Sequence, residues 1–238
     1  MNRAVVIDCF PNSVQRYRNE YAVVTVDVIR ATTVAVTAVA MGRKCFPVSS
    51  LEAARVLAAQ LNNPLLAGEL AGEMPKGFDM NNSPAELALR IDTSRPVILF
   101  SSTGTKLMCA AADCDAAYVA CFRNYLSLAT YLAGRHSKIA VIGAGSLGEF
   151  REEDQMCCAW IAEELSKSGY NPQNDQTVEI IKRWSGASPD AFVDNKSVDY
   201  LRRSGQLKDL DFILAHVNDL GDIFMIRHGQ IVRIRTKE

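Results

Sequence analysis

Short apolar runs alternate with longer amphipathic segments along most of this chain, and this alternation limits the possible folds more than any other feature. Several runs have the length and composition of buried strands, for example residues 22–26 (AVVTV) and 96–100 (PVILF). Between them stand segments with apolar residues at helical spacing, such as residues 51–61 (LEAARVLAAQL). The alternation predicts an α/β fold with three layers, in which a largely parallel or mixed sheet lies between helices.

Strands are expected over residues 3–9, 22–28, 45–50, 64–69, 96–102, 116–121 and 138–145. Helices are expected over residues 31–42, 51–61, 83–89, 104–112, 125–135, 151–168, 175–184, 196–204 and 208–216. A closing hairpin is expected to turn at His228 and Gly229. No low-complexity linker or repeat divides the chain, so we expect residues 1–238 to form a single domain with an elaborated C-terminal part.

The composition argues against several classes of protein. The net charge is -1 over 238 residues, which gives no electrostatic reason to expect nucleic acid or an anionic membrane as a partner. The apolar runs are shorter than the roughly 20 residues of a membrane helix, and Asp8 interrupts the N-terminal run that a signal peptide would need. The seven cysteines form no C-x-x-C pair, which favours reduced, buried thiols. We therefore expect a soluble, cytoplasmic protein.

Polar residues stand at the ends of four expected strands, where α/β proteins bind their ligands. Asp27 and Arg30 stand where the second strand gives way to a helix. The other three groups are Glu69, Asn82 and Ser83; Thr103, Gly104 and Thr105; and Gly148, Glu149, Glu153 and Asp154. Because all four groups follow strands, their shared position favours one common site.

These residue types suit a phosphorylated ligand and a hard divalent cation. Mg²⁺ prefers oxygen ligands and usually takes one or two carboxylates together with water and phosphate. The guanidinium of Arg30 is able to bind an oxyanion through two donors. Thr103, Gly104 and Thr105 open a helix, whose first N–H groups and dipole favour an anion. The segment is not a Walker A loop, because the pattern G-x-x-x-x-G-K-[ST] is absent.

Each group also has a purely structural interpretation. An aspartate at a strand end is often a helix cap, and an arginine there often pairs with a surface acid. Ser83 fits an N-cap, with Pro84 in the first turn and Glu86 completing a capping box. Residues 143–148 (GAGSLG) match the dinucleotide fingerprint G-x-G-x-x-G, but the acidic residues that follow repel a pyrophosphate. A dinucleotide-dependent oxidoreductase therefore stays as a minor alternative.

Four motifs, in this order, resemble those of the 2-phosphosulfolactate phosphatase family. They are DVIRATT (27–33), GFDMNNSP (77–84), STGT (102–105) and GEFREEDQMCCAWIAEEL (148–165). Members of that family have an α/β fold and use Mg²⁺ to remove phosphate from 2-phospho-3-sulfolactate, which leaves 3-sulfolactate for coenzyme M biosynthesis. The resemblance therefore implies a Mg²⁺-dependent phosphatase with a small phosphorylated acid as its substrate, and it is consistent with a homo-oligomer.

The resemblance and the strand-end positions together give the residues expected roles. The expected catalytic residues are Asp27, Arg30 and Glu69. The expected metal ligands are Asp27 with Glu149, Glu153 or Asp154, and Glu69 beside them. The expected substrate contacts are Asn82, Ser83, Thr103, Gly104 and Thr105. Whether Asp27 attacks phosphorus or only binds the metal stays open at this point.

Three positions depart from the family pattern. The family has arginine where this chain has Leu70, glycine where it has Asn81, and asparagine where it has Thr103. These changes alter the donors around a bound anion, so the resemblance supports Mg²⁺-assisted phosphatase chemistry better than it supports one particular substrate. The main alternative is a non-catalytic or differently specific relative that binds a small phosphorylated acid. A non-catalytic relative is distinguished by ligand affinity without phosphate release.

Overall fold

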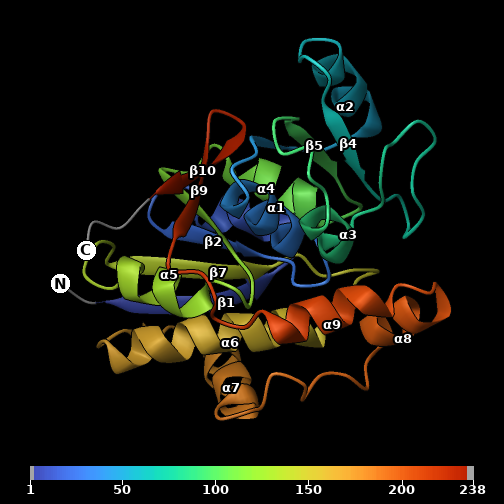
Figure 1. Cartoon of the computed structure of the whole chain (residues 1–238). Helices are drawn as coiled ribbons and strands as arrows, with labels where there is room; N and C mark the ends of the chain where they lie inside the picture. Colours follow the sequence, from blue (N-terminus) through green and yellow to red (C-terminus); the bar gives the residue numbers. More distant parts are fainter. Residues whose placement is uncertain (1–2, 235–238) are drawn as a thin grey trace.

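The computed structural model describes residues 3–234, in which helices cover both faces of one mixed sheet (Figure 1). The strands are β1 (Ala4–Cys9), β2 (Ala22–Val26), β3 (Cys45–Val48), β4 (Leu65–Gly68), β5 (Val97–Phe100), β6 (Ala116–Ala120), β7 (Lys138–Gly143), β8 (Asn171–Pro172), β9 (Ile223–Arg227) and β10 (Gln230–Ile234). The helices are α1 (Ala31–Ala40), α2 (Leu51–Ala58), α3 (Pro84–Ala88), α4 (Gly104–Ala111), α5 (Tyr125–Leu132), α6 (Glu152–Lys167), α7 (Asp175–Trp184), α8 (Lys196–Arg203) and α9 (Leu207–Ala215), with a short 3-10 helix η1 (Pro11–Arg16).

The structure confirms the predicted α/β class, because every strand and helix expected from the sequence is present with its ends shifted by a few residues. The hairpin turns at His228 and Gly229, both with positive φ, as a tight turn between twisted strands requires. Ser50 and Ser83 cap their helices through side-chain oxygens, as expected. Strand β8 and helix η1 were not predicted, because a two-residue strand and a single irregular turn leave no periodic pattern.

No helix among residues 3–234 has the length and apolarity needed to cross a membrane.

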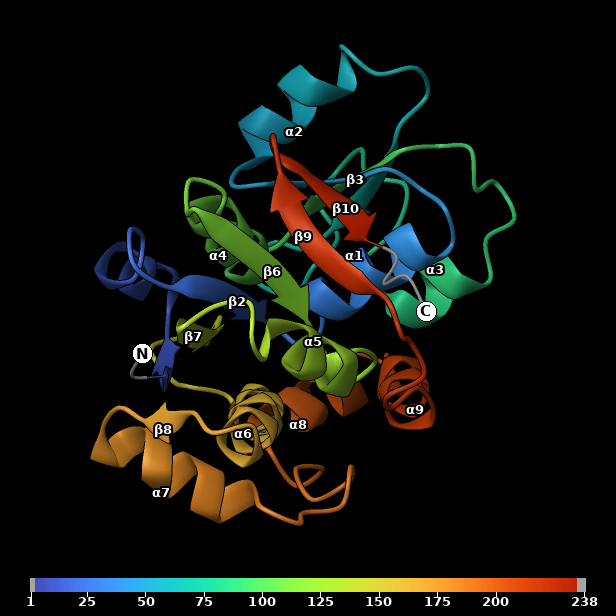
Figure 2. The same ribbon diagram turned by 90° about the vertical axis from the view of Figure 1, so that its left-hand side faces the viewer.

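The C-terminal hairpin joins two sets of parallel strands. The strand order is β4-β5-β3-β10-β9-β6-β2-β7-β1-β8. β10 pairs antiparallel with β3 at Ile231 and Cys45, and β9 pairs antiparallel with β6 at Met225 and Tyr118. Three antiparallel pairings in a row therefore separate β3 from β6, so the two sets run in opposite directions on either side of the hairpin (Figure 2).

Helix α1 lies at the centre of the fold because it is apolar on every side. Its residues from Ala31 to Val39 are all buried, as expected of a helix without a polar face. Its threonines bond locally: the hydroxyl of Thr33 donates to the carbonyl of Val28, and that of Thr37 to the carbonyl of Thr33. The helix packs against β3, β5, β6 and β10, strands of both sets and of the hairpin. The sheet therefore curves around α1, and this curvature brings together strand ends that belong to oppositely directed sets.

The other face of the sheet carries the larger apolar core. Helices α5, α6 and α7 pack there, around Phe122 and Trp160, whose ring centroids are 5.0 Å apart. Helices α8 and α9 extend the same core through Val198, Leu201 and Ile213. Helix α2 forms a smaller cluster over β3 and β5 at the opposite end of the sheet. The C-terminal helices are thus anchored in the main core, next to the ends of β2 and β7.

Candidate functional site

A cavity of about 670 Å³ opens where four of the parallel strands end. Its lining includes Asp27 after β2, Glu69 after β4, Thr103 after β5, and Asp154 in the helix after β7. Each of the four polar groups seen at strand ends in the sequence therefore contributes at least one residue to this cavity. Helix α8 supplies a further wall that no sequence pattern indicated: Lys196, Ser197, Asp199, Tyr200 and Arg203.

Asp27 is a buried carboxylate fixed by its own backbone surroundings. Its Oδ1 accepts a hydrogen bond from the N–H of Ala31 at 3.1 Å. Its Oδ2 lies so close to Gly104 that a Cβ on that residue would be 1.9 Å away, so only glycine fits at the start of α4. Burial, with the charges of Glu69 and Glu153, raises the pKa of Asp27 to about 7, against the opposing effect of the Ala31 N–H. The carboxylate is therefore held in one position and is costly to ionise without a cation.

Two further buried acids lie in the first turn of α6. The Oδ1 of Asp154 accepts from the N–H of Val28 at 2.8 Å, which ties α6 to the segment after β2. Burial, followed by the charges of Asp27 and Glu153, raises the pKa of Asp154 well above its usual value. Burial also raises the pKa of Glu153, whose Oε2 accepts from Asn195 at 2.7 Å. This concentration of buried negative charge favours a bound cation.

Glu69 occupies part of the anion site that the sequence predicted at the start of α4. Its carboxylate accepts from the N–H of Ser102 at 2.6 Å, the N–H of Gly72 at 2.7 Å and the hydroxyl of Ser102 at 2.9 Å. Thr105 is buried, and its N–H donates to the hydroxyl oxygen of Ser101, whose own N–H donates to the Oγ1 of Thr105. Thr103 lines the cavity, and its side chain is not used to cap α4. Of the three predicted residues only Thr103 therefore lines the cavity, and the neighbouring N–H of Ser102 already binds a carboxylate of the protein.

Arg30 reaches the cavity from a buried ion pair. Its Nη1 donates to Oδ2 of Asp209 in α9 at 2.6 Å and also to Gln206. Its Nη2 is 3.4 Å from Oδ1 of Asn81. The other oxygen of Asp209 accepts from the hydroxyl of Ser83. Asp209 of α9 thus fixes the arginine at the cavity wall.

Asn82 and Ser83 are neighbours with different surroundings. The Oγ of Ser83 accepts from the N–H of Glu86 at 3.1 Å and so caps α3. Ser83 is not part of the cavity lining. Asn82 lines the cavity, is only 2% exposed, and its Oδ1 has no hydrogen-bond partner within residues 3–234. A buried acceptor without a partner is unfavourable, so the Oδ1 of Asn82 is an acceptor that is available to a ligand of the cavity.

Glu149 lies apart from the buried acids. Its side chain is 48% exposed, and its carboxylate pairs with Arg151 at 3.0 Å and with Lys196 at 2.5 Å. The structure therefore does not bring Glu149 together with Asp27 and Asp154. Among the described residues, no three Asp, Glu, His or Cys side chains are placed to hold a metal ion by themselves. Mg²⁺ does not require such a cage, because water and phosphate commonly complete its coordination.

Gly143 and Gly145 serve packing, and Gly148 has a positive φ in a turn. A Cβ on Gly143 would lie 2.3 Å from the ring of Phe150, and a Cβ on Gly145 would lie 2.6 Å from the ring of Phe10. The following helix start, where a dinucleotide's pyrophosphate normally lies, carries the buried carboxylates of Glu153 and Asp154. The glycine pattern is thus explained without a dinucleotide.

The fold and the cavity together define an α/β protein with an acidic ligand site at strand ends and a wall of cationic side chains beside it. A model of the 2-phosphosulpholactate phosphatase family matches residues 9–226 of the chain. The chain therefore belongs to the 2-phosphosulfolactate phosphatase family, which confirms the resemblance seen in its four motifs.

Individual relatives cover most of the chain. A probable 2-phosphosulfolactate phosphatase of Clostridium perfringens (strain SM101) is 30% identical over 220 residues, which is 90% of this chain and 89% of the relative. A protein of the same name from Symbiobacterium thermophilum is 30% identical over 218 residues, 88% of this chain and 92% of the relative. A third, from Pseudothermotoga lettingae, is 35% identical over 148 residues, 62% of this chain and 63% of the relative.

Proposed function

We propose that this protein is a Mg²⁺-dependent phosphatase that hydrolyses the phosphate ester of a small anionic hydroxy acid. The proposed substrate is 2-phospho-3-sulfolactate and the product is 3-sulfolactate, in keeping with the names of its relatives. The proposal rests on the set of buried carboxylates at the base of the cavity. The negative charge of one carboxylate makes the ionisation of its neighbour less favourable.

The residues at the base of the cavity fit Mg²⁺. Asp27 and Asp154 provide two carboxylates, and Asn82 provides an amide oxygen that has no partner within the described chain. Oxygen donors in this number suit Mg²⁺, with water and substrate phosphate as its further ligands. We propose that these three residues hold the ion. When bound, Mg²⁺ supplies Lewis-acid stabilisation of charge on the phosphoryl group.

The side chains of the protein itself supply positioning and charge. The guanidinium of Arg30 is held by Asp209 and faces the cavity, where it neutralises an oxyanion of the phosphoryl group. Thr103, at the start of α4, adds a hydroxyl to the lining. Because phosphoryl transfer depends mainly on positioning and electrostatic stabilisation, these contributions suffice without a separate covalent catalyst.

The test measures phosphate release from 2-phospho-3-sulfolactate and a panel of phosphorylated hydroxy acids, with Mg²⁺ and with a chelator. The wild type is expected to release phosphate only with Mg²⁺. Asp27→Asn is expected to lose about a hundredfold or more in kcat, since it removes a charged ligand of the Mg²⁺ that stabilises charge on the phosphoryl group. No release from any ester by folded protein that still binds the esters would support a binding protein instead.

The same variant provides its own control for folding. Asparagine keeps a side-chain oxygen that accepts from the N–H of Ala31. It also replaces a buried carboxyl group, whose pKa is raised to about 7, with a neutral amide. Without metal, Asp27→Asn is therefore expected to melt at the same temperature as the wild type or higher. Stabilisation of the wild type by NAD, rather than by Mg²⁺ and the ester, would point to the oxidoreductase alternative.

A further inference from the structure

Helix α8 turns one polar face toward the cavity. Four of the five α8 residues that line the cavity stand at the i, i+3, i+4, i+7 spacing of a single helix face: Lys196, Asp199, Tyr200 and Arg203. Ser197 borders this face in the first turn. Val198 and Leu201 point the other way and are fully buried in the main core. The sequence of the helix therefore fixes which of its side chains face a ligand.

Hydrogen bonds at the start and in the middle of α8 connect this wall to the rest of the site. At its start, the Oδ1 of Asn195 accepts from the N–H of Val198 at 2.9 Å, while its Nδ2 donates to Glu153 at 2.7 Å. Further along, the hydroxyl of Tyr200 donates to the carbonyl of Gly72 at 2.5 Å, in the loop that follows Glu69. The helix is thus tied to α6 and to the loop after β4, and its polar face is preorganised.

The cations around the cavity differ in whether they already have partners. Arg30 pairs with Asp209, whereas Arg151 and Lys196 share the carboxylate of Glu149. Arg203 is exposed at the cavity, and its guanidinium makes no ion pair or hydrogen bond with another residue of the chain described here.

The acid on the same helix face does not neutralise Arg203. Asp199 pairs instead with Arg202, at 2.5 Å. The cavity therefore has buried acids at its base and cationic side chains along one wall. The paired N–H donors of the Arg203 guanidinium are still available to a ligand.

We propose that Arg203, with Arg151 and Lys196 beside it, binds one of the two anionic groups of the substrate that are not transferred, either its sulfonate or its carboxylate. The inference rests on the proposed function, because it assigns a charged group of that substrate. Glu149 shows that Arg151 and Lys196 already bind a carboxylate at this wall. The buried acids of the cavity repel an anion that no metal ion neutralises, so the phosphate is expected at the Mg²⁺ and one of the other two anionic groups at the α8 wall.

The first test compares kcat/KM for three esters: 2-phospho-3-sulfolactate, 2-phospholactate, which lacks the sulfonate, and the phosphate ester of 2-hydroxyethanesulfonate, which lacks the carboxylate. Arg203→Ala is expected to lower kcat/KM about ten- to a hundredfold for 2-phospho-3-sulfolactate. The loss should disappear for the ester that lacks the group bound by Arg203, which identifies that group. An equal loss for all three esters, or no loss, would overturn the subsite.

The matched control is Arg202→Ala, which removes an exposed arginine of the same helix that lies outside the cavity lining and is paired with Asp199. This variant is expected to keep wild-type kcat/KM for all three esters. Arg203→Lys keeps the positive charge but lacks the paired donors of a guanidinium. Its kcat/KM is therefore expected to lie between those of the wild type and Arg203→Ala. If Arg202→Ala lowered kcat/KM as much as Arg203→Ala, a general loss of positive potential would replace the proposed contact.

The second test measures binding of 3-sulfolactate by calorimetry, without turnover. The wild type and Arg202→Ala are expected to bind alike, and Arg203→Ala about tenfold or more weakly. If no ester is hydrolysed but this difference is seen, the subsite stands and the phosphatase proposal fails. If the wild type hydrolyses the ester while Arg203→Ala matches it in both kcat/KM and affinity, the subsite alone fails.

Discussion

At the scale of single residues, the site is held by bonds between side chains that lie far apart in the chain. Arg30 and Asp209 are 179 positions apart, and their side chains are 3% and 0% exposed. Asp154 and Val28 are 126 positions apart. Such pairs place a charge more rigidly than a neighbour in sequence does, because each partner is fixed by a different element.

The pair of Arg30 and Asp209 gives a prediction about stability and activity. Asp209→Asn leaves the guanidinium buried without its counter-charge, which is expected to cost about 3–5 kcal/mol in the free energy of unfolding and to lower kcat/KM for the phosphate ester. Urea unfolding and steady-state kinetics measure the two effects. Asp211→Asn is the control, since Asp211 is an exposed acid on the same helix and its removal should stay within about 0.5 kcal/mol. Equal costs for the two variants would contradict the role of Asp209.

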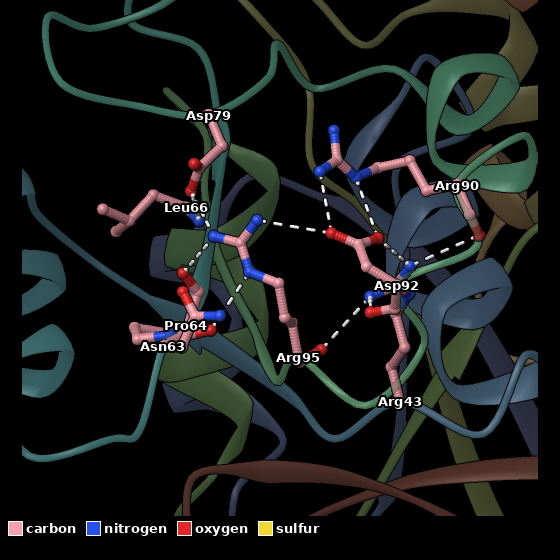
Figure 3. Close-up of polar contacts among 8 residues, drawn as sticks. All are labelled: Arg43, Asn63, Pro64, Leu66, Asp79, Arg90, Asp92 and Arg95. Atoms are coloured by element: carbon pink, nitrogen blue, oxygen red, sulfur yellow. Dashed lines mark hydrogen bonds and ion pairs between the residues drawn. The ribbon is translucent and has the colours of Figure 1, made fainter.

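At the scale of elements, a group of arginines around Asp92 fixes the segment between α3 and β5 (Figure 3). Arg43, with a fully buried side chain, pairs with Oδ1 of Asp92 at 2.8 Å, and Arg90 pairs with Oδ2 at 2.8 Å. Arg95 continues the network to Asp79 at 3.1 Å. Asp79, part of the second family motif, therefore positions the loop that carries Asn82 and lies outside the cavity lining.

This network predicts that the stability lost on replacing Asp92 depends on pH. Arg90 and Arg43 hold the pKa of Asp92 well below its usual range. Asp92 therefore takes up a proton at higher pH in the unfolded chain than in the folded chain. The stabilisation by its ion pairs is complete above about pH 4 and is lost as the pH falls further. Asp92→Asn should lower the free energy of unfolding by about 1–3 kcal/mol at pH 7, and by less at pH 3.

Urea unfolding of both proteins at the two pH values measures this difference. Asp113→Asn serves as the control, because the pair of Asp113 with Arg18 is exposed and is expected to contribute no more than about 1 kcal/mol. A cost for Asp92→Asn that is the same at pH 3 and pH 7 would rule out the ion pairs as its source.

The helices and strands themselves were predictable because their signals are local. Alternating apolar runs, the caps at Ser50 and Ser83 and the turn at Gly229 are all read within a few residues. The polar groups at four strand ends also identified the cavity. What the sequence could not reveal was long-range: the counter-ion of Arg30, the carboxylate of Glu69 in the predicted anion site, and the polar face of α8.

At the scale of the whole molecule, the last two strands of the described chain, β9 and β10, lie in the middle of the sheet. Phe224 of β9 is fully buried against the core around α1. Phe224→Ala is therefore expected to cost about 3–5 kcal/mol in the free energy of unfolding, as a large buried cavity does. Urea unfolding monitored by circular dichroism measures the change.

The control for this prediction lies in the same hairpin. Arg233 of β10 pairs with Asp222, and its side chain is 33% exposed. Arg233→Ala is expected to cost no more than about 1 kcal/mol. If Phe224→Ala proved no more costly than Arg233→Ala, the hairpin would be a surface addition rather than the link between the two strand sets.

The position of the hairpin also has a consequence during translation. Until β9 and β10 have left the ribosome, β3 and β6 each lack one neighbour, and two strand edges with free N–H and C=O groups are open at the same time. A nascent chain, or a product of premature termination before residue 223, therefore exposes two templates for pairing with other chains. Residues 223–234 are therefore needed to close both open strand edges. Without them, the rest of the chain is exposed to chaperones and proteases instead of folding to an enzyme.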